Sequence, residues 1–143
     1  MIRIYEATEP SDLLAEAFAR LLPQLSERMT APGREAVARI VASPATRQLV
    51  AAAEDGRIVG LLSVALYDVP SGRKAWIEDV VVDAAARGRG IGEALVREAL
   101  ALACREGVAR MMLTSNATRR AAHRLYERMG FVRYETDCFR LDL

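Results

Sequence analysis

A glycine-rich turn is the part of the sequence whose residue types and spacing most clearly suggest a ligand. It reads Arg87-Gly88-Arg89-Gly90-Ile91-Gly92 and lies between an apolar run and a segment with helical spacing. Glycine lets backbone approach a ligand closely, and the first N–H groups of a helix lack internal partners. Such a helix start binds phosphate, and Arg87 and Arg89 would add cations at its mouth. The alternative is a solvated turn whose arginines face water.

The spacing of this turn separates it from two other phosphate-binding motifs. A dinucleotide-binding fingerprint has G-x-G-x-x-G directly after a strand, and a P-loop needs Gly-Lys followed by Ser or Thr. Here the pattern is R-x-x-G-x-G after a predicted meander, and no Gly-Lys pair occurs. The sequence therefore excludes both motifs.

Two adjacent carboxylates, Glu78 and Asp79, precede the valines Val80 to Val82 on one predicted strand. Acids in an apolar strand are costly unless something uses or pairs them. Strand alternation would place Glu78, Val80 and Val82 on one face and Asp79 and Val81 on the other. A role in proton transfer and an ion pair with a nearby arginine are the two explanations.

At two places the sequence resembles the GCN5-related N-acetyltransferases (GNAT superfamily). The turn from Arg87 to Gly92 resembles the family's R/Q-x-x-G-x-G/A motif. The family's second motif, a helix with a tyrosine followed by Gly-Phe, is similar to Ala122-His123-Arg124-Leu125-Tyr126-Glu127-Arg128-Met129-Gly130-Phe131. Two motifs at the right separation are more specific than either alone.

The resemblance implies acetyl-coenzyme A as co-substrate, without a metal. Pantetheine would hydrogen-bond to the strand backbone at Val80 and Val82, with Val81 between them. Asn116 would also contact the cofactor, although the common family form has its asparagine where this chain has Arg119; a helix N-cap or turn role is the alternative for Asn116. The pyrophosphate would lie on the backbone amides of Arg87, Gly88, Arg89, Gly90, Ile91 and Gly92.

For catalysis, the resemblance implies that Tyr126 protonates the departing thiolate, although its helical spacing also fits a packing role. Glu78 is the preferred base, directly or through water. The implied activity is transfer of an acetyl group to a primary amine by direct attack in a ternary complex. A non-catalytic acyl-coenzyme A sensor of the same fold is the alternative.

Hydrophobic periodicity predicts the elements that position these residues. Helical spacing marks Leu13–Leu22, ended by Pro23, and then Gly33–Ala42, Ile91–Leu102 and Thr118–Met129. Strands are predicted at Ile2–Thr8, Gln48–Glu54, Arg57–Leu66, Ala75–Val82, Arg110–Thr114, Phe131–Tyr134 and Cys138–Leu143, with a tight turn at Asp55-Gly56. The order β-α-α-β-β-β-α-β-α-β-β predicts an α/β (α+β) fold, with a mixed, mostly antiparallel central sheet flanked by helices.

Length and composition are those of one globular domain, covering residues 1–143. The net charge of +1 argues against a nucleic-acid partner. Cys104 and Cys138 lack metal or disulfide spacing and are expected to be buried packing residues. Without a signal peptide or a long apolar run, the expected location is cytoplasmic, with no membrane contact. The acceptor, a small molecule or a peptide amine, is left open, and pairing through the sheet or the C-terminal strands would make a homodimer.

Overall fold

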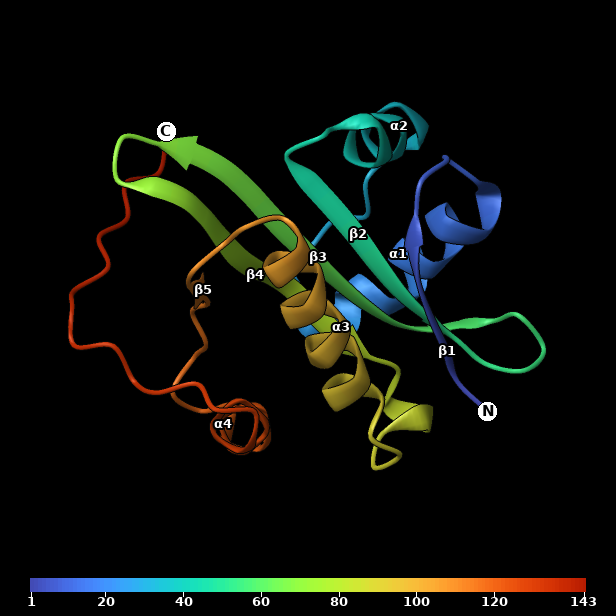
Figure 1. Ribbon diagram of the computed structural model, residues 1–143. Helices are drawn as coiled ribbons and strands as arrows, with labels where there is room; N and C mark the ends of the chain where they lie inside the picture. The colour runs from blue at the N-terminus through green and yellow to red at the C-terminus, as the bar shows by residue number, and fades with distance from the viewer.

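A five-stranded sheet forms the centre of the computed structural model, which describes residues 1–143 (Figure 1). Its strands lie in chain order, and each of the first three pairs antiparallel with the next, whereas the last pairs parallel with the fourth. The predicted Asp55-Gly56 turn joins the second and third strands, with Gly56 at a φ of 86°. The strands are β1 (Arg3–Ala7), β2 (Thr46–Ala52), β3 (Ile58–Val69), β4 (Gly72–Val82) and β5 (Met111–Met112).

Helices cover both faces of this sheet, and each face has its own apolar cluster. On one face α1 (Asp12–Leu25) and α2 (Arg34–Ala42) pack on a cluster that contains Phe18, Leu61 and Val81. On the other face α3 (Ile91–Arg105) packs on a cluster that contains Leu95 and Ile77 (Figure 1). The remaining helices are a 3₁₀ turn, η1 (Ala84–Ala86), and α4 (Arg120–Arg128). The predicted mixed, mostly antiparallel fold is confirmed.

A bulge in β4 reverses the alternation of its side chains. Ser63 pairs with Glu78 and Leu61 with Val81, so Leu62 of β3 stands opposite two residues of β4. Asp79, at the bulge, has a φ of 50° and is the one non-glycine residue with a positive φ. Left-handed backbone is least costly for Asp and Asn among side-chain-bearing residues.

This reversal contradicts the predicted grouping of Glu78 with Val80 and Val82. The two valines pack on the α3 side, as Ile77 does before the bulge. Glu78 lines a cavity on the α1–α2 side, together with Phe18. The extra residue in β4 is the physical reason, because strict alternation assumes a ladder without insertions.

Pro23 does not end the first helix, which continues to Leu25. A proline removes one helical hydrogen bond, and so close to the helix end the loss is confined to the last turns. The helix closes instead at Ser26, whose N–H donates to the Leu22 carbonyl at 3.1 Å.

The two predicted C-terminal strands, Phe131–Tyr134 and Cys138–Leu143, do not form. Strand β5 is two residues long, so it offers a neighbouring segment almost no ladder of backbone hydrogen bonds. The segment runs past β5 (red in Figure 1) with exposed apolar side chains, Val132 and Phe139 being 86% and 91% accessible. Cys138 lies in it and is exposed, as is Cys104, so the expected burial of both cysteines is wrong.

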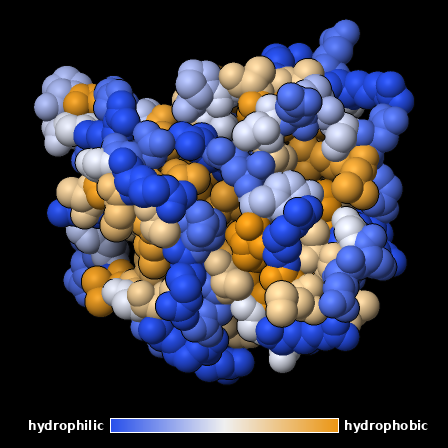
Figure 2. Space-filling model, turned by 45° about the vertical axis from the view of Figure 1, so that its right-hand side comes forward, coloured by the Kyte–Doolittle hydropathy of each residue, from blue (hydrophilic) through white to orange (hydrophobic).

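On the face seen in Figure 2, apolar patches interrupt a largely hydrophilic surface. None of the helices combines the length and the apolar character that crossing a membrane requires. No three His, Cys, Asp or Glu side chains gather where they could hold a metal ion.

Candidate active site

The glycine turn has the backbone geometry of an anion cradle. Gly88 and Gly90 have φ values of 78° and 75°, which side-chain-bearing residues rarely adopt. Gly90 is the N-cap of α3, and the Ala94 N–H donates to its carbonyl at 3.0 Å. The amides from Ile91 to Glu93 therefore precede the first helical hydrogen bond and are left for a ligand.

Gly92, in the glycine turn, lies close to Leu125, in the second sequence motif. A Cβ atom at this position would lie 3.2 Å from Leu125 Cδ2, on α4. A side chain at position 92 would therefore require Leu125 to shift, so Gly92 lets the start of α3 lie close against the tyrosine-bearing helix.

A groove of about 730 Å³ runs from the glycine turn to α4. It brings together most of the predicted cofactor residues: Val80, Val81, Val82, Arg87, Gly88, Gly90, Ile91, Gly92 and Tyr126. Arg89 does not line the groove. The groove is strongly cationic, since one acid, Glu93, accompanies the arginines Arg87, Arg119, Arg120, Arg124 and Arg128. Arg87 Nε donates to the Val82 carbonyl at 3.1 Å, at one of the two predicted pantetheine positions.

Strands β4 and β5 separate beyond their short pairing. They pair only at Ala75–Met111 and Trp76–Met112, although β4 continues to Val82. Past that point a cavity of about 200 Å³ lies between them, lined by residues 77–80 of β4 and 113–115 after β5. This splaying leaves one edge of β4 without a strand partner.

Tyr126 and Glu78 line this same cavity between the strands. Tyr126 is 9% accessible and packs edge-on against Phe131, with ring centroids 5.8 Å apart. Burial raises the pKa of Tyr126, and the positive charge of Arg119 opposes that rise. A phenol with a raised pKa stays protonated and remains a proton donor.

Glu78 is suited to accept a proton, whereas Tyr126 is suited to donate one. Burial raises the pKa of its carboxyl, and the negative charge of Asp79 raises it further. Neither acid forms an ion pair, so the structure lacks the salt bridge that was the alternative explanation. A carboxylate of raised pKa is a better proton acceptor at neutral pH than an ordinary one.

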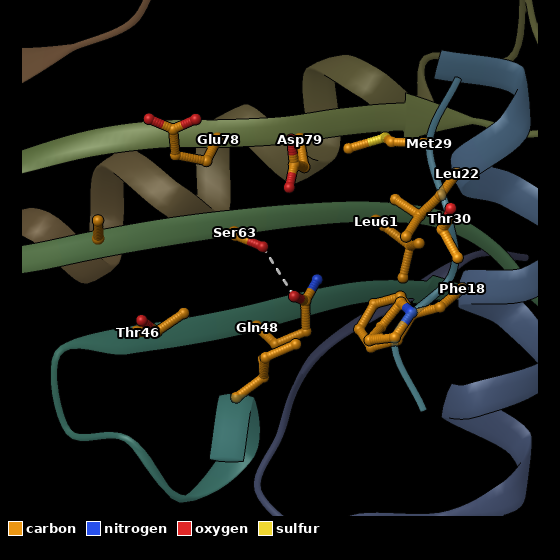
Figure 3. A pocket seen from close by; sticks show the side chains of 13 residues that line it. Phe18, Leu22, Met29, Thr30, Thr46, Gln48, Leu61, Ser63, Glu78 and Asp79 are labelled. Atoms are coloured by element: carbon orange, nitrogen blue, oxygen red, sulfur yellow. Dashed lines mark hydrogen bonds between the residues drawn. The ribbon is translucent and has the colours of Figure 1, made fainter. Parts of the chain in front are cut away.

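A further cavity of about 350 Å³ opens on the other side of Glu78, beneath α1 and α2. Its apolar wall includes Phe18, Leu22 and Leu61, and its polar wall includes Gln48 and Ser63 (Figure 3). Ser63 Oγ donates to Gln48 Oε1 at 2.7 Å. The cavity shares no lining residue with the cationic groove, and Glu78 borders both the cavity and the gap between the strands.

Residues 8–131 match the model of the acetyltransferase (GNAT) family. The chain belongs to this family. Mycothiol acetyltransferase of Renibacterium salmoninarum is 33% identical over 91 residues, which are 62% of this chain and 27% of that protein. The chain spans between 25% and 35% of the length of the curated relatives it matches.

Solved structures agree with the family along the whole chain. A Trypanosoma brucei acetyltransferase is 29% identical with a TM-score of 0.81, covering 100% of both chains. An aminoglycoside acetyltransferase from an uncultured soil metagenomic sample has a TM-score of 0.85 at 23% identity, covering 100% of this chain and 99% of that one. The second likeness shows the GNAT fold alone.

Asn116 departs from the common GNAT pattern in the structure as well as in the sequence. Its Oδ1 accepts from the Thr118 N–H at 2.9 Å and from Thr118 Oγ1 at 2.8 Å. Its carbonyl contacts His123 Nε2 at 3.0 Å. These contacts are those of a turn residue before α4, the alternative role for Asn116, and the residue does not line the groove.

Arg119, which stands where the common GNAT form has its asparagine, lines both the groove and the gap between the strands. The sequence analysis gave Arg119 no role of its own, although its distance of seven residues from Tyr126 was the available signal. Ser115 was also missed: its Oγ is buried without a hydrogen-bond partner, and Ser115 borders the gap beside Tyr126. No motif in the sequence marks Ser115.

Helix α1 holds the segment that leads into the glycine turn. Arg20 donates to Asp83 Oδ2 at 2.9 Å and to the Ile58 carbonyl at 2.7 Å. Gln24 Oε1 accepts from the Ala84 N–H at 2.8 Å. These contacts fix the end of β4 and the start of η1, and the turn's position depends on both.

Proposed function

We propose that this chain transfers an acetyl group from acetyl-coenzyme A to a primary amine by direct attack in a ternary complex. The observation that carries the proposal is that Glu78 and Tyr126, one suited to accept a proton and one to donate it, border one gap between β4 and β5. The relatives named above are acetyltransferases, which supports acetyl as the transferred group.

The residues of the groove fit a phosphate-bearing nucleotide. The free amides at the start of α3 and the unpaired edge of β4 are both donors to a ligand. Among the arginines of the groove only Arg128 forms an ion pair within the protein, with Glu93. The other four have charge available: Arg87, Arg119, Arg120 and Arg124. The glycine turn would hold the pyrophosphate, and Val80 and Val82 the pantetheine amides. Acetyl-coenzyme A itself supplies the thioester carbon that the amine attacks.

The proposed reaction has two proton transfers within the site, one to Glu78 and one from Tyr126. The acceptor ammonium gives a proton to Glu78, and the freed amine forms a C–N bond at the thioester carbon. A second proton passes from the attacking nitrogen to solvent as the C–S bond breaks. Tyr126 donates its proton to the departing sulfur, so thiol and amide are the products and the phenol is restored from solvent.

Release of free thiol tests this activity directly. The protein is incubated with acetyl-coenzyme A and a panel of primary amines, and thiol is followed against a no-acceptor control. Acceptor-dependent release with mass-confirmed N-acetylation is the expected result. Tight binding of acetyl-coenzyme A without turnover on any amine would support the non-catalytic sensor instead.

A further inference from the structure

The cavity beneath α1 and α2 carries charge of one sign only. Among its thirteen lining residues Glu78 and Asp79 are acidic, and none is Lys, Arg or His. Neither carboxylate is neutralised by a salt bridge within the protein. A ligand carboxylate or phosphate would therefore meet two like charges in this cavity, with no cation to offset them.

The hydrogen-bonding polarity of the cavity is a second, independent observation. Gln48 is 3% accessible, and its Nε2 donates to the carbonyls of Leu49 and Leu62 at 3.1 and 3.3 Å. Its Oε1 accepts the Ser63 hydroxyl, so Ser63 turns oxygen lone pairs, not a proton, toward a ligand. The donors of this pair are used within the protein, so Gln48 and Ser63 offer a ligand only acceptors.

The two carboxylates do not point the same way. Figure 3 shows Asp79 directed toward Ser63 and Glu78 directed away from it. The bulge at Asp79 causes this divergence, since its φ of 50° interrupts the strand between the two acids. Two positive groups on one ligand can thus each meet a separate carboxylate.

The volume of the cavity and its apolar wall further restrict the size and chemical class of the ligand. A volume of about 350 Å³ is at the lower end of the range for small-molecule sites. Phe18, Leu22 and Met29 contribute hydrocarbon to one side of the cavity. A short aliphatic stretch between two charged groups fits this combination of walls.

We infer that the acceptor is a small amine with a second positive charge, such as a short alkyl diamine, and that amines bearing an anionic group are rejected. The inference rests on the proposed function. The reacting ammonium lies at Glu78, and the second ammonium lies at Asp79 with Ser63 as a further acceptor.

Three acceptors of equal chain length test the inference: putrescine, butylamine and γ-aminobutyrate, which differ only in the distal group. The expected order of kcat/KM is putrescine, then butylamine, then γ-aminobutyrate, with steps of about tenfold, the lower end for a hydrogen bond to a charged group. In Asp79→Asn the putrescine-to-butylamine ratio should fall to the statistical factor that putrescine's two equivalent amines give. Asn is isosteric and tolerates the left-handed backbone at this position. Asp55→Asn, in the exposed β2–β3 turn, is the matched control and should keep the ratio.

A preference for γ-aminobutyrate over putrescine would overturn the inference and leave the proposed function standing. If acetyl-coenzyme A binds but no amine is acetylated, the proposed function fails, and calorimetry with the coenzyme A complex decides the charge preference. Putrescine binding that is at least about tenfold weaker in Asp79→Asn would uphold it. Equal binding of the three ligands, or none at all, would refute it.

Discussion

The groove beside α4 and the cavity beneath α1 and α2 share no lining residue and differ in how they present charge. The groove gathers arginines around backbone amides at a helix start. The cavity presents two carboxylates and hydrogen-bond acceptors, with no cation. Backbone amides serve any sequence that makes the turn, whereas the cavity depends on particular side chains.

This difference sets how far ligand binding in each half of the site depends on particular side chains. A helix N-terminus binds phosphate through groups that every residue carries. An acceptor cavity has to match one small molecule through side-chain charge, hydrogen bonds and shape. The following predictions separate the two halves by asking whether a change alters turnover, cofactor affinity or pH dependence.

The largest effect on turnover is expected at Glu78, which borders both the cavity beneath α1 and α2 and the gap between β4 and β5. Glu78→Gln removes the proton acceptor with little change of shape, so kcat should fall by about a thousandfold, within the range for general base catalysis. The dissociation constant of acetyl-coenzyme A, measured by calorimetry, should not change. Glu54→Gln, in the exposed β2–β3 turn, is the control. A fall in cofactor affinity equal to the fall in kcat would place Glu78 in the groove instead.

Within the groove, Gly90→Val should weaken acetyl-coenzyme A binding by about a hundredfold. A side chain at a φ of 75° costs about 1–2 kcal/mol in strain, and each lost hydrogen bond to a charged phosphate costs about 1.5–3 kcal/mol. Gly107→Val is the matched control, because Gly107 has a φ of 77° and equally open surroundings. The two variants should lose similar amounts of folding stability, but only Gly90→Val should lose affinity for acetyl-coenzyme A. Unchanged affinity in Gly90→Val would disprove the phosphate role.

Tyr126→Phe keeps the ring packed against Phe131 and removes only the hydroxyl. We expect kcat to fall by about ten- to a hundredfold, at or below the lower end of what acid catalysis contributes, because thiols are far more acidic than alcohols and a thiolate leaves readily without a proton. Thiol release at saturating substrates gives this value. A variant as active as the native protein would show that Tyr126 has a packing role alone.

The smallest effect concerns pH. Glu78 must be deprotonated to act, so activity is lost as pH falls through its raised pKa. Burial is the larger cause of that rise and the charge of Asp79 the smaller. Asp79→Asn removes only the smaller cause, so the acid limb of kcat/KM should move partway to lower pH. Profiles measured beside Asp55→Asn provide the check, and a shift to higher pH would contradict it.

The glycine turn and the order of elements through α4 could be predicted because they depend on local sequence. Left-handed glycines and a helix start are signalled by the residues themselves. The bulge at Asp79 could not be predicted, since alternation carries no sign of an inserted residue. The prediction of C-terminal strands was wrong for a related reason. Phe131–Tyr134 has the composition of a strand, but a strand also requires a neighbouring strand with which to form hydrogen bonds. Asn116 has the residue type that the family motif calls for, but its side-chain oxygen accepts hydrogen bonds from Thr118.

Helix α1 touches both halves of the site. Phe18 and Leu22 line the cavity proposed for the acceptor, while Arg20 and Gln24 hold Asp83 and Ala84 ahead of the glycine turn. If an acceptor shifts this helix, it also shifts the backbone that receives the pyrophosphate. By thermodynamic linkage, the factor by which an acceptor changes cofactor affinity equals the factor by which the cofactor changes acceptor affinity. One ion pair, between Arg20 and Asp83, would then tune the two affinities together.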